Sequence, residues 1–274
     1  MMTKTYVVTG ATSGIGKTLV EQLAKDNIVF AGYRSESKGA ELAQFSNNIH
    51  TFYVDYAKPE TIIGAVKFIK SKTQKIDTLI NIAGCVVAGP VEKVSIDEIR
   101  RQFDVNVFGH IEMTQGLIEL LNGGKIINVS SMSSFGIFPF ISPYCASKRC
   151  LDMFFNSLLI ESKRNIKVVS IKPGAIATPL WDKSIKENTE AMSNCVGFEE
   201  EMDFIAKNAR KNETKGLCVE KVVEIIIKAD KLKNPKLSYL VGKDAYIASV
   251  LSKLPQVFVN KIIKFGLKAR MKRI

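Results

Sequence analysis

A tyrosine and a lysine four residues apart are the side chains of this sequence best suited to proton transfer. Tyr144 and Lys148 belong to the run Tyr-Cys-Ala-Ser-Lys, inside a segment with a helical pattern over residues 142–163. Residues four positions apart lie on one face of a helix, so the phenol and the ammonium can serve the same site. An ammonium favours the ionised form of a nearby phenol and lowers its pKa from the ordinary value of about 10. We therefore expect Tyr144 to act as a general acid or base beside Lys148.

The same spacing occurs a second time, at Tyr239 and Lys243. This copy straddles a predicted strand and the turn at Gly242, where the argument from a helix face does not apply. We therefore expect only the first copy to form a site.

A glycine-rich turn follows the first predicted strand and opens the first predicted helix. It reads Thr9-Gly10-Ala-Thr-Ser-Gly14-Ile-Gly16. Gly10 permits the sharp turn, Gly14 lets backbone approach a pyrophosphate, and Gly16 allows the helix to pack closely on the sheet. The helix N-terminus adds unpaired N–H groups and the positive end of its dipole. A glycine cluster can also be a chance turn, but the strand–loop–helix context predicts a dinucleotide-binding site.

The end of the next predicted strand indicates which dinucleotide binds. It reads Phe30-Ala-Gly-Tyr33-Arg34-Ser35, at the position expected for the adenosine ribose. A carboxylate there would bind the 2′-hydroxyl of NAD, and this stretch has none. The planar guanidinium of Arg34 is suited to the 2′-phosphate of NADP. We expect NADP(H) to be preferred and NAD(H) to be possible; the alternative is that Arg34 is a solvated surface residue.

Further segments share the order and spacing of one known family. They are Asn81-Ile82-Ala83-Gly84, Ser130-Ser131, the run from Tyr144 to Lys148, and Pro173-Gly174-Ala-Ile176-Ala-Thr178. Together with the glycine-rich turn they resemble the short-chain dehydrogenase/reductase family in its shorter, single-domain branch, over about residues 5 to 242. The sequence is similar to hydroxysteroid- and retinol-dehydrogenase-like members, and it departs from the family's usual Asn-Asn-Ala-Gly at Ile82.

The resemblance implies a catalytic set made up of Asn106, Ser131, Tyr144 and Lys148. Ser131 would hydrogen-bond the substrate oxygen, Tyr144 would exchange the proton, and Lys148 would also hold the nicotinamide ribose. Asn106, in a helix predicted over 95–121, would anchor a water that links the lysine to solvent. A local packing role is the alternative for Asn106.

The resemblance also assigns cofactor contacts. Asp55 would recognise the adenine amino group, and Ile176 and Thr178 would contact the nicotinamide carboxamide. The full set of predicted cofactor contacts is Thr9, Gly10, Ser13, Gly14, Ile15, Gly16, Arg34, Asp55, Asn81, Ala83, Gly84, Tyr144, Lys148, Pro173, Gly174, Ile176 and Thr178.

These residues must be positioned by alternating strands and helices. Short β-rich runs are predicted at 5–9, 28–32, 49–54, 78–81, 125–130, 168–172 and 237–241. Helical patterns cover 15–26, 36–46, 59–72, 95–121, 142–163 and 219–230. Such alternation predicts an α/β fold, with a Rossmann-like doubly wound parallel sheet of about seven strands and helices on both faces. We expect a single catalytic domain over 1–244, with a substrate lid over 179–218, followed by a basic amphipathic extension over 245–274.

Composition excludes several classes. The chain has 274 residues, of which 46% are hydrophobic, which is too many for a disordered protein. The five cysteines are scattered without a C-x-x-C pair, so neither a disulfide framework nor a zinc site is expected, and no metal is predicted. No signal peptide or membrane-spanning run is evident, so we expect a cytoplasmic protein. His50 and His110 lack partners at ligand spacing and are interpreted as packing or surface residues.

The net charge of +12 is concentrated at one end of the chain. Residues 245–274 carry seven basic residues and no acidic one, so 12 − 7 leaves +5 for the rest. No recognition motif accompanies this charge, and no nucleic-acid partner is expected. A basic amphipathic helix here can lie on anionic lipid, or it can pack beside the substrate site with a solvated edge; both interpretations stay open.

Apolar side chains near the predicted catalytic set indicate the substrate. Phe135, Phe138 and Phe140 precede Tyr144, and the predicted lid carries Trp181, Met192, Phe198, Met202 and Phe204. We expect an NADP-dependent oxidoreductase that interconverts a lipophilic ketone or aldehyde and its alcohol, in steroid, retinoid or other lipid metabolism. One alternative is that these aromatic residues only pack the core, and another is a catalytically idle NADP-binding sensor on the same fold.

The helix that carries Tyr144 also presents a run of apolar residues. They are Met153, Phe154, Phe155, Leu158 and Leu159. We interpret them as a face packed in the core or in a subunit interface. The family resemblance implies a subunit seam, and hence a homodimer or homotetramer.

Overall fold

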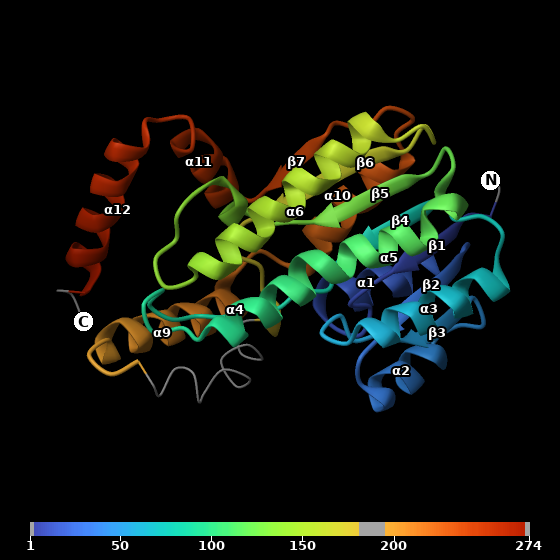
Figure 1. Cartoon of the computed structure of the whole chain (residues 1–274), viewed down its shortest axis with the longest axis horizontal. Helices are drawn as coiled ribbons and strands as arrows, with labels where there is room; N and C mark the ends of the chain where they lie inside the picture. Colours follow the sequence, from blue (N-terminus) through green and yellow to red (C-terminus); the bar gives the residue numbers. More distant parts are fainter. Residues whose placement is uncertain (1–2, 181–194, 272–274) are drawn as a thin grey trace.

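Seven parallel strands form the centre of the molecule in the computed structural model, which describes residues 3–180 and 195–271. Their order in the sheet is β3-β2-β1-β4-β5-β6-β7 (Figure 1). Each neighbouring pair is parallel. The strands are β1 (Thr5–Val8), β2 (Ile28–Tyr33), β3 (Ile49–Tyr53), β4 (Thr78–Asn81), β5 (Lys125–Val129), β6 (Lys167–Pro173) and β7 (Ser238–Val241). The predicted doubly wound sheet is confirmed.

Helices connect the strands and cover both faces of the sheet. The α-helices are α1 (Gly14–Leu23), α2 (Glu36–Ala43), α3 (Pro59–Lys72), α4 (Ile96–Phe103), α5 (Gly109–Leu117), α6 (Ser142–Glu161), α9 (Glu199–Lys215), α10 (Val219–Lys231), α11 (Lys243–Leu251) and α12 (Gln256–Met271). Short turns of other helix types are η1 (Asp104–Phe108), η2 (Ile118–Leu121) and η3 (Met132–Phe135).

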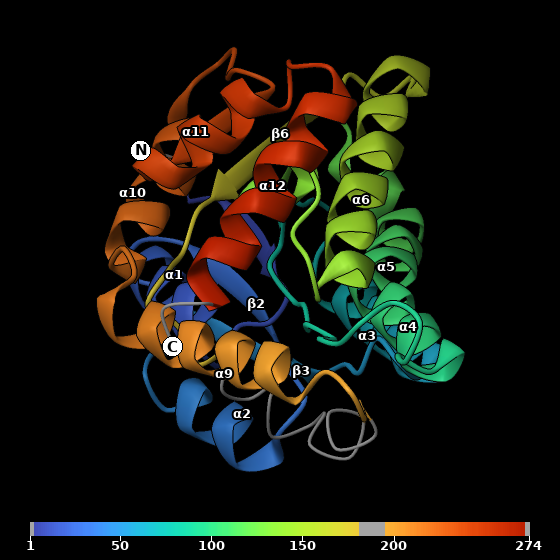
Figure 2. The same ribbon diagram turned by 90° about the vertical axis from the view of Figure 1, so that its left-hand side faces the viewer.

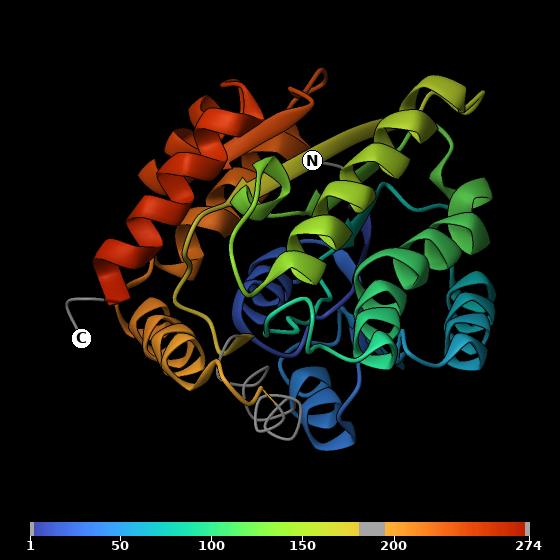
Figure 3. The same cartoon turned by 60° about the vertical axis from the view of Figure 1, so that its left-hand side comes forward.

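The central strands β1, β4, β5 and β6 are buried on both faces, whereas the edge strands β3 and β7 include exposed positions. Successive side chains of a strand point to opposite faces of the sheet. In β1, Tyr6 and Val8 pack with residues of α1 and α10, whereas Val7 packs with residues of α3, α5 and α6. Helices α3, α5 and α6 cover one face of the sheet, and α1 and α10 cover the other. Figure 3 shows the green α5 and the yellow-green α6 together on the first of these sides. Two apolar layers therefore cover the faces of the sheet, and its carboxyl edge is left to support a site.

The single helix predicted over 95–121 is wrong in detail. The chain there forms α4, the π-helical turn η1, α5 and the 3₁₀ turn η2. Ser95 caps α4, since its hydroxyl accepts a hydrogen bond from the Glu98 backbone N–H at 3.2 Å. The π-helical turn contains Asn106, whose side chain bonds outside the helix, and such turns are frequent at functional sites.

The predicted lid over 179–218 includes a helix that the sequence pattern did not indicate. Residues 181–194, with Trp181 and Met192, lie outside the described residues. Residues 199–215 form α9, which begins with three glutamates and buries only Met202 and Ala209. Most of its 17 residues are charged or polar, so its apolar residues are too few to predict a helix from their pattern.

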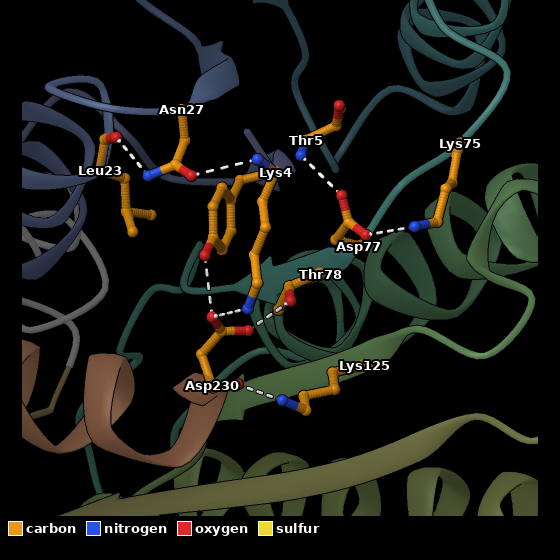
Figure 4. Close-up of polar contacts among 10 residues, drawn as sticks. Lys4, Thr5, Leu23, Asn27, Lys75, Asp77, Thr78, Lys125 and Asp230 are labelled. Atoms are coloured by element: carbon orange, nitrogen blue, oxygen red, sulfur yellow. Dashed lines mark hydrogen bonds and ion pairs between the residues drawn. The ribbon is translucent and has the colours of Figure 1, made fainter. Parts of the chain in front are cut away.

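A buried aspartate joins the amino ends of the central strands, at the edge opposite their carboxyl ends (Figure 4). The Asp230 carboxylate, at the end of α10, accepts hydrogen bonds from Lys4 and Tyr6 at 2.8 Å each and from Thr78 at 2.6 Å. Lys125 donates to the Asp230 backbone carbonyl. Burial acts to raise the pKa of the Asp230 carboxyl, but these hydrogen bonds outweigh it and lower that pKa. The network fixes α10 across β1, β4 and β5.

Candidate active site

The predicted site residues gather at the carboxyl edge of the sheet. The strand order reverses between β1 and β4, and ligands of open α/β sheets bind at such a switch point. Thr9 follows β1, Asn81 ends β4 and Ser130 follows β5, so three neighbouring strands deliver predicted residues to one place. The topology thus brings together motifs that are far apart in the sequence.

The glycine-rich turn forms a cradle that larger residues would fill. Gly10 and Gly14 have φ values of 65° and 48°, a region that favours glycine. A Cβ on Gly10 would lie 2.8 Å from the Ala83 backbone nitrogen, and one on Gly16 would collide with the Gly10 carbonyl. A Cβ on Gly14 would lie 3.2 Å from Thr178 Cγ2. The open backbone at the start of α1, where Ser13 and Ile15 also lie, fits a pyrophosphate group.

Thr9 ties this turn to the end of β4. Its hydroxyl oxygen accepts hydrogen bonds from the backbone N–H groups of Ile82 and Ala83, at 3.1 and 3.4 Å. The Ala83 carbonyl in turn bonds His110 Nε2 at 2.8 Å. Burial, together with the Lys148 charge, lowers the pKa of His110 to about 3, so this imidazole is neutral and structural.

Two other predicted cofactor contacts lie at the ends of outer strands. Arg34 is exposed, directly after β2 and before the Ser35 cap of α2. Asp55 follows β3, and its Oδ1 accepts a hydrogen bond from the Ala57 N–H at 3.1 Å. Both therefore lie on the β3-β2 side of the switch point, as the prediction requires of residues near an adenosine.

Tyr144 and Lys148 lie in the first turns of α6, and both are buried. Lys148 Nζ is 5.8 Å from the centroid of the Tyr144 ring and donates to the Val129 carbonyl at 3.0 Å. The Ser131 side chain hydrogen-bonds Tyr144, and it also accepts from the Ser133 N–H at 3.1 Å, which starts η3. The structure thus brings the predicted serine, tyrosine and lysine together. At the second Tyr-x-x-x-Lys copy, Gly242 has φ 102° and separates β7 from α11, so Tyr239 and Lys243 share no helix face.

The expected lowering of the Tyr144 pKa is wrong for this structure. Burial raises the pKa of Tyr144 to about 12, and the hydrogen bond with Ser131 opposes that shift only in part. Burial also lowers the pKa of Lys148 to about 8, against the opposing charge of Asp152. Burial disfavours the charged forms of both groups, so Tyr144 is protonated across the neutral range.

Asn106 acts as a clamp between three segments. Its Oδ1 accepts from the Cys85 N–H at 2.9 Å, and its Nδ2 donates to the Cys85 carbonyl at 2.9 Å and to Ser147 Oγ at 3.0 Å. A Cβ on Gly84 would lie 3.3 Å from Asn106 Oδ1 and 3.6 Å from Lys148 Nζ. The amide therefore holds the segment after β4 against α6, close to the lysine.

Asn81 bonds along the sheet. Its Nδ2 donates to the Asn128 Oδ1 at 2.8 Å, and the two residues are opposite each other in the β4–β5 ladder. Through its Nδ2, Asn81 holds β4 to β5, while its buried Oδ1 has no hydrogen-bond partner among the described residues.

The segment from Pro173 to Thr178 is held by a residue that the sequence did not single out. The Gly174 N–H donates to the Val241 carbonyl at 2.9 Å, and the Ala175 N–H donates to Asp244 Oδ2 at 2.6 Å. Ile176 pairs with Leu217 in an isolated bridge. Asp244 and its partner Ala175 are 69 residues apart in the sequence, so no local spacing indicates the role of Asp244.

A buried ion pair on α6 was also missed. Asp152, one turn after Lys148, lies 2.7 Å from Lys172 Nζ of β6 and accepts a hydrogen bond from Ser170 at 3.0 Å. Lys172 Nζ lies 4.4 Å from the centroid of the Phe135 ring. Residues 144, 148 and 152 recur every four positions, a signal that could have placed Asp152 on the face of Tyr144.

Apolar side chains surround Tyr144. It belongs to a buried cluster with Val86, Ala88, Ile141 and Cys145. Phe138, Leu180 and, from α9, Ile205 pack against this cluster. The described residues contain no group of three His, Cys, Asp or Glu side chains arranged to hold a metal. The arrangement can transfer a proton in an apolar setting beside a dinucleotide-shaped cradle.

Comparison with known proteins gives one consistent family. The sequence model described as short chain dehydrogenase matches residues 4–189. The uncharacterized oxidoreductase YusZ of Bacillus subtilis is 32% identical over 254 residues, 89% of this chain and 90% of that protein. The NADPH-dependent 3-dehydrocapnine reductase of Ornithobacterium rhinotracheale is 31% identical over 275 residues, 96% of each chain. The crystal structure of a short chain dehydrogenase from Burkholderia cenocepacia in complex with NADP has a TM-score of 0.73 at 24% identity, covering 95% of this chain and 98% of that one, a likeness of fold.

Proposed function

Because this chain belongs to the short chain dehydrogenase family, we propose that it is an NADP-dependent oxidoreductase that interconverts a lipophilic ketone or aldehyde and its alcohol. The observation that carries the proposal is the contact of Ser131, Tyr144 and Lys148 inside an apolar cluster, next to the glycine cradle. Residues 1–244 would form the catalytic domain in the cytoplasm, with α9 in its lid.

The residues have distinct roles in this mechanism. When bound, the cofactor supplies or accepts the hydride. In the direction of reduction, the Tyr144 phenol donates its proton to the carbonyl oxygen, and Ser131 hydrogen-bonds the same oxygen. The Lys148 ammonium stabilises the phenolate left on Tyr144. Asn106 holds the backbone after β4 against α6, the helix that carries Tyr144 and Lys148.

NADP preference is assigned to Arg34. The NADPH dependence named for the reductase that is 31% identical supports this choice. Arg34→Ala is expected to raise KM for NADPH by roughly 10- to 100-fold, because a charge-assisted hydrogen bond contributes about 1.5–3 kcal/mol. KM for NADH should change little. Steady-state kinetics with both cofactors measure the effect, with Lys38→Ala, an exposed residue of α2, as the matched control. Unchanged NADPH preference in Arg34→Ala would refute the assignment.

The substrate class is tested by a panel of steroids, retinoids, fatty aldehydes and quinones, followed by the loss of NADPH absorbance. The apolar side chains of Val86, Ile141, Phe138 and Ile205 around Tyr144 favour the more lipophilic members. Short hydrophilic carbonyls are the comparison set. If the protein binds NADPH but turns over none of these compounds, the catalytically idle sensor on the same fold is the better explanation.

A homodimer or homotetramer is also proposed, on the exposed side of α6. Met153, Phe154 and Ile160 are 56%, 48% and 85% exposed, although Phe155 packs in the core. Large apolar side chains that recur on one exposed helix are typical of subunit contacts.

A further inference from the structure

The C-terminal helices α11 and α12 expose an unusual number of large apolar side chains. Among the described residues, eight of the 22 large hydrophobic side chains that are exposed fall within residues 246–265. They are Tyr246, Ile247, Val250, Leu254, Val257, Phe258, Ile262 and Phe265. The surface of a soluble protein seldom carries so many exposed apolar side chains in one region, and such patches are typical of interaction sites.

Helix α12 divides into three faces by its residue spacing. Phe258, Ile262 and Phe265 follow one another at four and three positions, so they form one stripe, and they are 60%, 52% and 77% exposed. Val259 and Ile263 lie on a different side, and Val259 is only 9% exposed. The outward stripe of α12 is thus apolar, and it is a different face from the one that packs on the rest of the molecule through Val259.

A basic stripe borders the apolar one. Lys261 and Lys264 are exposed and lie three apart, beside the row of Phe258, Ile262 and Phe265. Lys253, in the turn before α12, is exposed as well, and no acidic residue occurs from 245 to 274. An apolar stripe next to an exclusively basic one matches a surface with an apolar interior and anionic headgroups.

The position of α12 leaves these stripes accessible. Figure 1 shows α12 at one end of the molecule, and Figure 2, turned by 90°, shows it on the outside above α9. It packs against α9, while α11 packs on η3, the turn that Ser131 caps. In the described part of the chain no helix is long and apolar enough to cross a bilayer, so contact would be at the surface.

We propose that the exposed face of α11 and α12 binds the surface of an anionic lipid bilayer. Two copies of the chain are a poorer occupant, because pairing this face with itself would bring basic stripes of like charge together. Docking there would leave η3 and α9, the elements next to Tyr144, directly behind α11 and α12 and close to the lipid surface. That last step rests on the proposed lipophilic substrate, whereas binding to vesicles does not.

Co-sedimentation of the full chain with vesicles tests the proposal. Binding is expected to vesicles of phosphatidylcholine with phosphatidylglycerol and to be at least tenfold weaker with phosphatidylcholine alone, since each basic residue near an anionic surface contributes roughly a fivefold gain. Phe258→Asn/Phe265→Asn and Lys261→Glu/Lys264→Glu should each weaken binding tenfold or more. Phe45→Asn and Lys67→Glu, exposed residues of the opposite part of the chain, should leave it unchanged.

Two further measurements separate the outcomes. Reduction of a water-soluble carbonyl should be unchanged in the stripe variants, so their effect on vesicle binding is independent of the active site. Light scattering reports whether they alter the oligomeric mass. Equal sedimentation of the wild type with and without anionic vesicles would overturn the proposal, as would unimpaired vesicle binding by both stripe variants. A smaller oligomer in the stripe variants, with no vesicle binding by the wild type, would mean that a second copy covers this face.

Discussion

Replacing Tyr144 with phenylalanine is expected to lower kcat/KM for carbonyl reduction by a factor of about 100 to 10,000, the range for loss of a positioned general acid. The change removes one oxygen atom from a buried ring, along with its hydrogen bond to Ser131. Lys148 keeps its bond to the Val129 carbonyl, so the cofactor site should stay formed. Fluorescence titration with NADPH should therefore give a dissociation constant within about twofold of the wild type, while turnover is lost.

The second Tyr-x-x-x-Lys copy supplies a matched control. Tyr239→Phe removes a phenol that accepts a hydrogen bond from the Lys236 N–H at 3.1 Å, far from the catalytic cluster along the chain. This variant should retain nearly full activity. Substantial carbonyl reduction by Tyr144→Phe, or an equal loss in both variants, would show that the Tyr144 phenol is not the proton donor.

The pH profile of the wild type gives the same mechanism a second test. With its pKa raised to about 12, Tyr144 remains protonated and imposes no limit near neutrality. Lys148 loses its ammonium as the pH rises through about 8, and the phenolate formed on Tyr144 is then no longer stabilised. The kcat/KM for reduction should therefore be level at lower pH and fall above about pH 8.

The sequence predicts the parts of this protein that follow from local pattern. The central strands could be placed because they are short runs buried on both faces, and Tyr144 and Lys148 because their spacing matters only on a helix. Helix α9 was missed because most of its residues are charged or polar and few apolar residues mark a buried face. The pKa of Tyr144 was predicted in the wrong direction because a sequence shows which charged residue is near but not how deeply the phenol is buried. Asp244 depends on a long-range contact that only the fold creates.

Removing the buried charge of Asp152 is expected to be the most destabilising of the changes considered. The Asp152 and Lys172 side chains are only 5% and 10% exposed, and their charged atoms lie 2.7 Å apart. Asp152→Asn would leave the Lys172 ammonium buried without its partner, which costs about 3–5 kcal/mol of the free energy of unfolding. For a chain of this size that corresponds to a fall of roughly 6–20 °C in Tm. Urea unfolding and differential scanning calorimetry measure both quantities.

A double-mutant cycle measures the coupling between Asp152 and Lys172 independently of catalysis. Lys172→Met should be destabilising alone, whereas Asp152→Asn/Lys172→Met should recover much of the loss because no uncompensated charge remains. Asp97→Asn, which breaks the exposed Arg100 pair, should cost less than about 1 kcal/mol. Additive losses in the double variant would contradict the coupling.

Asp152→Asn is also expected to change the pH dependence of reduction, because Asp152 affects the pKa of Lys148. The Asp152 carboxylate favours the Lys148 ammonium and so opposes the effect of burial on the Lys148 pKa. The net result is a pKa lowered to about 8. Without that carboxylate the pKa of Lys148 falls further, and the pH above which reduction declines should move to a more acidic value. A purely structural role would lower the amount of folded protein without moving the profile, so a shifted limb in Asp152→Asn identifies Asp152 as a positioning residue for the Tyr144–Lys148 pair.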